Sequence, residues 1–313
     1  MEQKTEVFTP GAGGTASPFS GELTSPSVIR SLMEEAGISF RKEYGQNFLV
    51  HAAAVARIAD SAADTEDACI LEIGPGVGTL TRELAARYRR VLAVEIDAGL
   101  MPVLSRTLAD KPNVTVFRAD VMELDLPALL EKESGGLPVY VCANLPYYIT
   151  TPILMRLLSC GVCFRSITVM IQDEVADRLI APPGSAAYGA ITAVLGYYGT
   201  VERLFRVPAG CFLPAPKVDS AVVRLSLYEE KPFSPLSEPC FFRTVKAAFG
   251  QRRKTLVNAL SAGFSALSKA MLTGIVTGLG YSPTVRGECL STQEFVALSD
   301  ALYRASAPGR SAD

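Results

Sequence analysis

Histidine is almost absent from this chain, with one residue, His51, in 313. The sequence also lacks a second cysteine pair to match the Cys-x-x-Cys formed by Cys160 and Cys163. A zinc site needs about four ligands, so we expect no metal site, and we interpret the two cysteines as small buried residues near a helix end.

Long apolar runs are missing as well. No run reaches the roughly 18 residues that a membrane-spanning helix needs. The first 27 residues are rich in Gly, Pro, Ser and Thr, but have neither the apolar core of a secretory signal nor the arginines of a transit peptide. We predict a disordered tail there. Seven cysteines, without regular spacing, favour a reducing cytoplasm.

An excess of positive charge is the third absence, because the formal net charge is −2. The composition therefore gives no overall sign of a nucleic-acid partner. A local basic cluster does occur in "FGQRRKTLVNAL", where Arg252, Arg253 and Lys254 are consecutive. It is consistent with an RNA-binding patch or with a solvated helix start, and the pattern alone leaves both open.

Short apolar runs rich in Val and Ile alternate with helical patterns between about residues 68 and 180. Runs at 68–73, 90–96, 113–119, 138–144 and 166–172 predict buried strands. This alternation is typical of an α/β fold with a doubly wound, mostly parallel, Rossmann-like sheet. Two further runs, 200–207 and 220–228, predict a β-hairpin that closes the sheet.

The chain is long enough for two domains, and its character changes near residue 231. Only helical patterns follow. We predict a tail over 1–27, a cofactor-binding domain over 28–230 and a small all-helical domain over 231–313.

A glycine-rich loop, "LEIGPGVGTL", follows the first of the predicted central strands, with glycines at 74, 76 and 78. A dinucleotide-binding loop would need a third glycine at the position of Thr79. The loop is therefore either a tight strand-to-helix turn or part of the binding site for a different ligand. Glu95, Asp120 and Asn144 end the next three strands. Ligands of open α/β sheets bind at such strand ends. The array resembles the S-adenosylmethionine site of class I methyltransferases, in which the acids accept hydrogen bonds from ribose and adenine.

The segment "NLPYYI" (144–149) is similar to the Asn-(Leu/Ile/Pro)-Pro-(Tyr/Phe) motif of enzymes that methylate conjugated amines. The side-chain oxygen of Asn144 and the carbonyl of Pro146 can accept from the two N–H groups of an adenine amine. Tyr147 can stack on the ring. The amine is neutral before transfer, so positioning and electrostatics suffice without a histidine base.

Several segments together resemble one family, the small-subunit ribosomal RNA adenine N6-dimethyltransferases. These are "YGQNFL" (44–49), "EIGPGVGTLT", "FLPAPKVDSAVVRL" (212–225), "FGQRRKTLVNAL" and "VRGECLSTQEF", which cover the chain from about residue 40 to 300. The resemblance implies cofactor contacts at Asn47, Leu49, Gly74, Glu95, Asp120 and Asn144. It places Phe212 against the target base, opposite Tyr147.

The implied reaction is dimethylation of two adjacent adenines near the 3′ end of 16S ribosomal RNA, with S-adenosylmethionine as cofactor. The implied partner is the small ribosomal subunit or its precursor. We expect the protein to be a monomer in the cytoplasm, and we expect Arg252, Arg253 and Lys254 to bind RNA phosphates. Two departures stand out: Tyr148 replaces the Asn of many members, and "RGECL" replaces Arg-Ala-Glu-Asn-Leu.

Three alternatives remain. A large-subunit (23S) RNA adenine methylase shares the loop and the Asn-Pro-Tyr set, although "FGQRRKTL" and "VRGECLSTQEF" favour the small-subunit family. A non-catalytic RNA-binding assembly factor can be built on the same fold, but Gly74, Glu95, Asp120 and Asn144 are all present. An NAD-linked dehydrogenase is disfavoured by Thr79 and by the shortage of histidine.

Overall fold

Two compact units make up the protein in the computed structural model, which describes residues 6–10, 19–39 and 46–306. The first unit comprises Met1–Ala176 and Glu202–Leu227, and the second comprises Asp177–Val201 and Tyr228–Asp313.

The first unit is built on an eight-stranded sheet with the order β1-β5-β4-β3-β6-β7-β10-β8. Its five central strands are mutually parallel where they pair. They are β3 (Cys69–Ile73), β4 (Arg90–Glu95), β5 (Val114–Arg118), β6 (Val139–Asn144) and β7 (Ser166–Gln172). All five coincide with the predicted strands. The chain moves outward from β3 through β4 to β5 and then returns to the other side of β3 with β6, so the order reverses beside β3, where open α/β sheets bind ligands.

The edges of this sheet are antiparallel. On one side, β10 (Ser220–Leu227) pairs with β7, and β8 (Gly199–Val207) follows β10. The prediction that these two segments close the sheet is confirmed. A separate two-stranded sheet joins β2 (Phe48–Leu49) to β9 (Phe212–Leu213).

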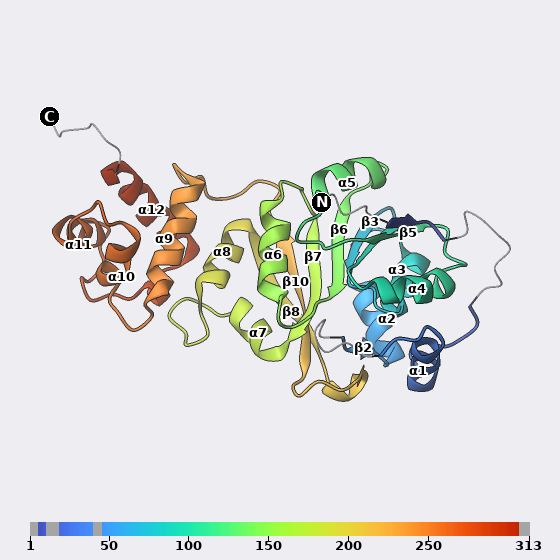
Figure 1. Cartoon of the computed structure of the whole chain (residues 1–313). Helices are drawn as coiled ribbons and strands as arrows, with labels where there is room; N and C mark the ends of the chain where they lie inside the picture. Colours follow the sequence, from blue (N-terminus) through green and yellow to red (C-terminus); the bar gives the residue numbers. More distant parts are fainter. Residues whose placement is uncertain (1–5, 11–18, 40–45, 307–313) are drawn as a thin grey trace. The chain divides into compact units, whose positions relative to one another are not determined.

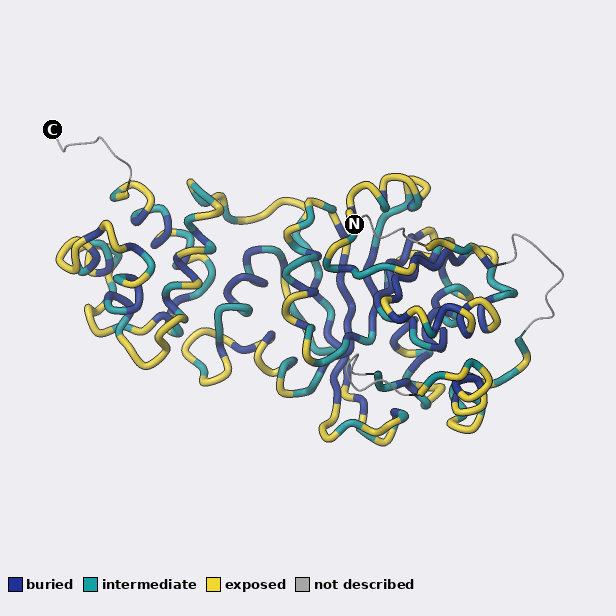
Figure 2. The backbone as a smooth tube through the Cα atoms, in the orientation of Figure 1, coloured by how far each residue is buried: buried dark blue, intermediate teal, exposed yellow. Residues whose placement is uncertain are grey.

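Helices cover both faces of the central sheet (Figure 1). On one side lie α2 (Ala52–Asp60), α3 (Thr79–Arg87) and α4 (Met101–Thr107), and on the other lie α5 (Leu126–Glu133) and α6 (Thr150–Ser159). Strands β3 and β4 are therefore buried almost along their whole length. Figure 2 shows the buried backbone of the protein in dark blue. Burial on both faces explains the continuous Val- and Ile-rich sequences of β3 and β4, because a strand with one face exposed to solvent would alternate apolar and polar residues. The Rossmann-like fold prediction is confirmed.

The N-terminal segment differs from the disordered tail that we predicted over 1–27. Residues Glu6–Phe8 form β1, which pairs antiparallel with β5, and α1 (Pro26–Glu35) begins at Pro26. Leu23 is buried, and its carbonyl accepts a hydrogen bond from the Thr79 hydroxyl at 3.2 Å. Composition missed this order because it comes from contacts with distant residues. Residues 1–5 and 11–18 lie outside the described residues.

The second unit is helical, as predicted, but it begins earlier than residue 231. It contains α8 (Ala190–Tyr198), α9 (Glu238–Gly250), α10 (Leu256–Gly263), α11 (Lys269–Gly278) and α12 (Thr292–Ser306). Helix α8 belongs here because the Tyr197 ring packs on Phe241 with centroids 4.8 Å apart, and Thr292 donates to the Ala193 carbonyl at 3.0 Å. The predicted boundary therefore misplaced residues 177–201.

None of the helices in the described ranges is long and apolar enough to cross a membrane.

Candidate active site

The glycine loop between β3 and α3 forms one wall of a pocket at the carboxyl ends of the parallel strands. Gly74, Gly76 and Gly78 have φ angles of 71°, 61° and 89°, in the left-handed region that favours glycine. At Gly76 a side chain is also excluded by space, because a Cβ would lie 2.9 Å from the Phe48 ring. The loop thus presents bare backbone to the pocket.

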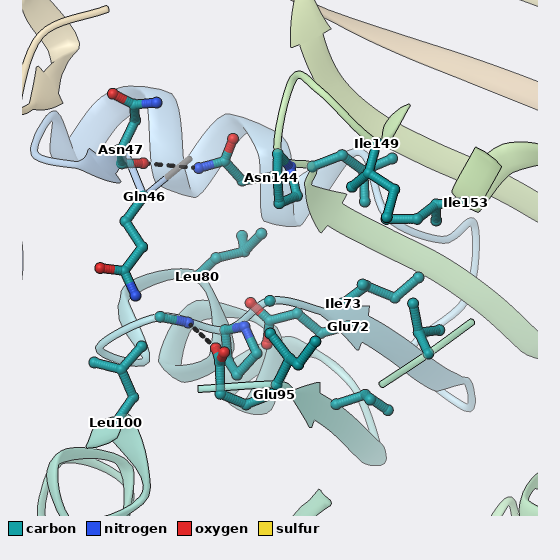
Figure 3. A pocket seen from close by; sticks show the side chains of 18 of the residues that line it. Gln46, Asn47, Glu72, Ile73, Leu80, Glu95, Leu100, Asn144, Ile149 and Ile153 are labelled. Carbon is teal, nitrogen blue, oxygen red and sulfur yellow. Dashed lines mark hydrogen bonds between the residues drawn. The ribbon is translucent and has the colours of Figure 1, made fainter. Parts of the chain in front are cut away.

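Most of the residues expected in the site line this single pocket, part of which is shown in Figure 3. They are Asn47, Leu49, Gly74, Glu95, Asp120, Asn144, Pro146 and Tyr147. Figure 3 shows Asn47 and Asn144 together on one side of the view, and Glu72 and Glu95 on the other. The parallel strands bring Gly74, Glu95, Asp120 and Asn144 to one edge of the sheet, because their carboxyl ends lie at that edge. The segment before β2 adds Asn47, which is 97 residues from Asn144 in the sequence.

Glu95 is only 5% exposed at the end of β4. Its Oε1 accepts from the Asp97 backbone N–H at 2.8 Å, and its Oε2 accepts from the Gly76 N–H at 3.2 Å. Burial raises the pKa of this carboxyl to about 7, and the neighbouring negative charge of Asp97 adds to the rise, whereas the two N–H donors oppose it. Glu95 is therefore hydrogen-bonded to the glycine loop, and its pKa lies near neutral pH.

Two side chains next to Glu95 were not anticipated. Asp97 is buried, with Oδ1 accepting from the Gly99 N–H at 2.9 Å and Oδ2 accepting from Gln46 Nε2 at 2.9 Å. Gln46 lines the pocket directly. The hydrogen bond between Gln46 and Asp97 connects the segment before β2 to the residues that follow β4, so it fixes these two parts of the pocket wall to each other.

Asp120 follows β5, with Oδ1 accepting from the Met122 backbone N–H at 2.8 Å. This bond is one of the local bonds that Asp side chains commonly make at turns. It fixes the carboxylate at the pocket rim, where the remaining oxygen can face a ligand.

Asn144 ends β6, and its Nδ2 donates to the Asn47 carbonyl at 3.1 Å (Figure 3). This bond fixes the direction of the amide. The NH₂ group is used on the protein side, so Oδ1 is left as the acceptor of the pair. The amine-binding role of Asn144 stays a prediction.

The Pro146 carbonyl, the second expected acceptor, already receives two hydrogen bonds. The Ile149 N–H and the Thr150 hydroxyl both donate to it at 3.2 Å. The Thr150 hydroxyl also lies 3.5 Å from the Tyr147 carbonyl, which is an alternative acceptor. Thr150 is buried at the start of α6 and was not among the expected residues.

Tyr147 is anchored through its hydroxyl, which lies 2.7 Å from Oγ of Ser220 at the start of β10. Ser220 is fully buried. Burial raises the pKa of the Tyr147 phenol, so the group is neutral at physiological pH. The hydrogen bond to Ser220 fixes the position of the Tyr147 ring in the pocket wall.

Phe212 is the expected residue that does not line the pocket. It lies on β9 opposite Leu49 of β2, and it is only 4% exposed. Almost all of its surface is already covered by the protein. A contact between Phe212 and a target base stays a prediction that this conformation does not support.

The basic cluster lies in the helical unit, in the turn between α9 and α10, and all three residues are exposed. Arg252 has internal partners: it donates to the Ala186 carbonyl and its Nε lies 3.5 Å from Glu288. Arg252 therefore braces the loop before α8. Arg253 and Lys254 show no ion pair within the described part of the chain.

Glu72, the fourth of the five residues of β3, was not anticipated from the sequence. It is 1% exposed, it lines the pocket, and its Oε2 has no hydrogen-bond partner among the described residues. Burial raises the pKa of this carboxyl to about 8, the neighbouring Thr81 hydroxyl opposes the rise, and the nearby Glu95 adds to it. An unpartnered buried carboxyl oxygen is costly, and a cationic ligand group would satisfy it. A glutamate inside an apolar strand pattern was the only signal.

Together, the reversal of strand order, the bare glycine loop and the acids at the ends of β4 and β5 define the class: a Rossmann-like, class I methyltransferase domain. The Asn-Leu-Pro-Tyr turn at the end of β6 narrows it to enzymes that methylate amines.

The family is shown by comparison with known proteins. The model of the ribosomal RNA adenine dimethylase family matches residues 37–279, and the chain belongs to this family. Among similar curated proteins, the ribosomal RNA small subunit methyltransferase A of Alkaliphilus oremlandii is 44% identical over 282 residues, which cover 90% of this chain and 98% of the relative. The protein of the same name from Shouchella clausii is 43% identical over 284 residues, covering 90% and 96%.

Solved structures agree on the fold. The 23S rRNA methyltransferase ErmE has a TM-score of 0.64 and 26% identity, covering 82% of this chain and all of that chain. A dimethyladenosine transferase from Plasmodium falciparum has a TM-score of 0.63 at 21% identity, covering 89% and 96%. The predicted family is confirmed.

Proposed function

We propose that this protein transfers methyl groups from S-adenosylmethionine to the exocyclic amines of two adjacent adenosines in the 3′-terminal hairpin loop of 16S ribosomal RNA. The product is N6,N6-dimethyladenosine at both positions. The substrate is the small ribosomal subunit or its precursor, and the enzyme acts as a monomer in the cytoplasm. The observation that carries the proposal is the amide of Asn144, which donates through Nδ2 to the Asn47 carbonyl and lines the pocket together with Pro146 and Tyr147.

The pocket residues fit the cofactor. S-adenosylmethionine supplies an activated methyl group on a sulfonium, and it also carries an ammonium, ribose hydroxyls and an adenine. Glu72 is buried, and its Oε2 has no hydrogen-bond partner among the described residues, which suits a cationic group. Glu95 can accept from ribose hydroxyls and Asp120 from the adenine amine, while the glycine loop allows close approach of the backbone. Asn47 and Leu49 complete the wall.

Asn144 and Pro146 would act on the target amine as paired acceptors. The adenine amine is a poor nucleophile because its lone pair is delocalised into the ring. Two acceptors on its N–H groups hold the nitrogen in one orientation and favour the pyramidal form that attacks. Tyr147, anchored by Ser220, would stack on the ring, a contact worth roughly 1–3 kcal/mol per base. The amine gains a positive charge on methylation and then loses a proton to water.

One adjustment follows from the hydrogen bonds at Pro146. A carbonyl oxygen has two lone pairs, and both are used by Ile149 and Thr150. The Thr150 hydroxyl can rotate to the Tyr147 carbonyl, 3.5 Å away, and free one lone pair for the amine. Thr150 would therefore release the acceptor when the base binds, at little cost, because it exchanges one carbonyl for another.

A second candidate is methylation of 23S ribosomal RNA, favoured by the similarity to ErmE. The identity of 44% to small-subunit enzymes, over almost the whole chain, weighs more than 26% to ErmE.

The test uses tritiated S-adenosylmethionine with separated small and large ribosomal subunits from cells that lack these methyl groups. The RNA is digested and the labelled nucleoside is identified. We expect N6,N6-dimethyladenosine in the small subunit alone. Label in the large subunit would support the second candidate, and cofactor binding without incorporation would point to a non-catalytic assembly factor.

A further inference from the structure

Tyr148 lies at the mouth of the pocket with most of its surface open. It lines the pocket and is 63% exposed, the highest value among the exposed large apolar side chains of the described residues. No hydrogen bond or ring contact holds it within the described part of the chain. An aromatic ring in this position is not needed for packing.

The two consecutive tyrosines are in different situations. Tyr147 is half-buried and tied to Ser220 through its hydroxyl. Tyr148, the next residue in the same turn, keeps both its ring and its hydroxyl available. Because Tyr147 is already committed to the pocket, Tyr148 offers a second aromatic surface immediately outside it.

We propose that Tyr148 is a specificity-determining residue that stacks on the base next to the adenosine in the pocket. The inference rests on the proposed function and extends it to the neighbouring nucleotide. A flat aromatic surface at the rim of a base-binding pocket suits a nucleobase, since every base has a π-face that can stack. With one adenosine inside the pocket, the adjacent base of the same strand is held outside it, on Tyr148.

The contact is made both in the bound state and in the transition state. Interactions of this kind lower KM without changing kcat. Removal of one base–aromatic stack is expected to raise KM for the RNA by about 5- to 150-fold, the range that measured stacking contacts imply. The chemical step and the affinity for the cofactor should not change.

The test compares Tyr148→Ala and Tyr148→Phe with the wild-type protein on undermethylated small ribosomal subunits. Tyr148→Ala should raise KM for the subunit and leave kcat and cofactor binding as they are, whereas Tyr148→Phe keeps the ring and should restore the wild-type KM. Tyr303→Ala is the matched control, because Tyr303 is 44% exposed on α12 in the helical unit, outside the pocket. It should behave as wild type.

A second arm identifies the base. Small subunits are reconstituted with RNA that is abasic at the neighbour of the target adenosine, and KM is measured for wild type and Tyr148→Ala. If Tyr148 stacks on that base, the fold increases in KM caused by Tyr148→Ala and by the abasic site do not multiply, because each change removes the same contact. Losses that multiply would overturn the inference, as would an unchanged KM for Tyr148→Ala on intact RNA.

Failure of the proposed function looks different. It would appear as absence of methyl transfer by the wild-type protein, before any variant is compared. A wild-type protein that dimethylates the small subunit, with Tyr148→Ala equal to it, refutes only the role of Tyr148.

Discussion

Replacing Glu72 by Gln should stabilise the protein at high pH and weaken its grip on the cofactor at the same time. Glu72 is fully buried in β3, and burial raises its pKa from 4.5 to about 8. Between these two values the unfolded chain has released the proton that the folded chain keeps. The folded state then binds more protons than the unfolded state, so the free energy of unfolding falls as pH rises through this window.

The size of the effect follows from the shift. A difference of 3.5 pKa units, from 4.5 to about 8, corresponds to roughly 5 kcal/mol, as an order of magnitude. Gln has nearly the same shape and no proton to lose. The difference in unfolding free energy between Glu72→Gln and wild type should therefore grow by several kcal/mol between about pH 5 and pH 9, in favour of the variant.

The assay is urea unfolding of both proteins across this pH range, with Glu131→Gln as control. Glu131 is exposed on α5, so its curve should run parallel to that of the wild type. Equal pH dependence of Glu72→Gln and wild type would refute the burial argument.

Cofactor affinity gives the second half of the prediction. If the Glu72 carboxylate pairs with a cationic group of the cofactor, its removal should cost roughly 1–3 kcal/mol, a factor of about 5 to 150 in Kd. The pH dependence of the affinity should differ between the wild type and Glu72→Gln, because only the wild type has a carboxyl that ionises at this position. Isothermal titration of both proteins measures this, and equal Kd values would place the cation elsewhere.

The remaining predictions concern Glu95 and the basic cluster. Glu95→Ala should raise Kd for the cofactor before it affects the rate at saturating cofactor, which equilibrium binding and single-turnover kinetics distinguish; an unchanged Kd would contradict the ribose role. Neutralising Arg253 and Lys254 should reduce the slope of log affinity against log salt by about 0.7–0.9 per lost phosphate contact, measured by RNA binding over a KCl series. An unchanged slope would return the cluster to a structural role. Arg252→Ala should instead lower the thermal stability of the helical unit, because Arg252 braces residues 186–188; an unaltered melting curve would contradict this.

How much of this was predictable from sequence differs between elements. The five central strands have runs of Val and Ile between helical patterns, and burial on both faces leaves that signature in any sequence. Glu95, Asp120 and Asn144 were predictable as neighbours, because each ends a strand of one parallel sheet.

Other features depend on contacts that no local pattern encodes. Helix α8 belongs to the helical unit through Phe241 and Thr292, which are distant in sequence. Strand β1 has only three residues, and its order comes from pairing with β5. Thr150 and Ser220 contribute to the site through hydrogen bonds of their hydroxyl groups, to the Pro146 carbonyl and to the Tyr147 hydroxyl. The family resemblance assigned a role to Phe212, but it could not show that this side chain is buried.

The most direct test of the central claim is the rate of methyl transfer by Asn144→Ala in a single turnover on undermethylated small subunits, with cofactor binding measured on the same preparation. Asn144 Oδ1 is the acceptor fixed by the bond from Nδ2 to the Asn47 carbonyl. We expect methyl transfer to be abolished while the cofactor is still bound. A near-normal rate would contradict the acceptor mechanism.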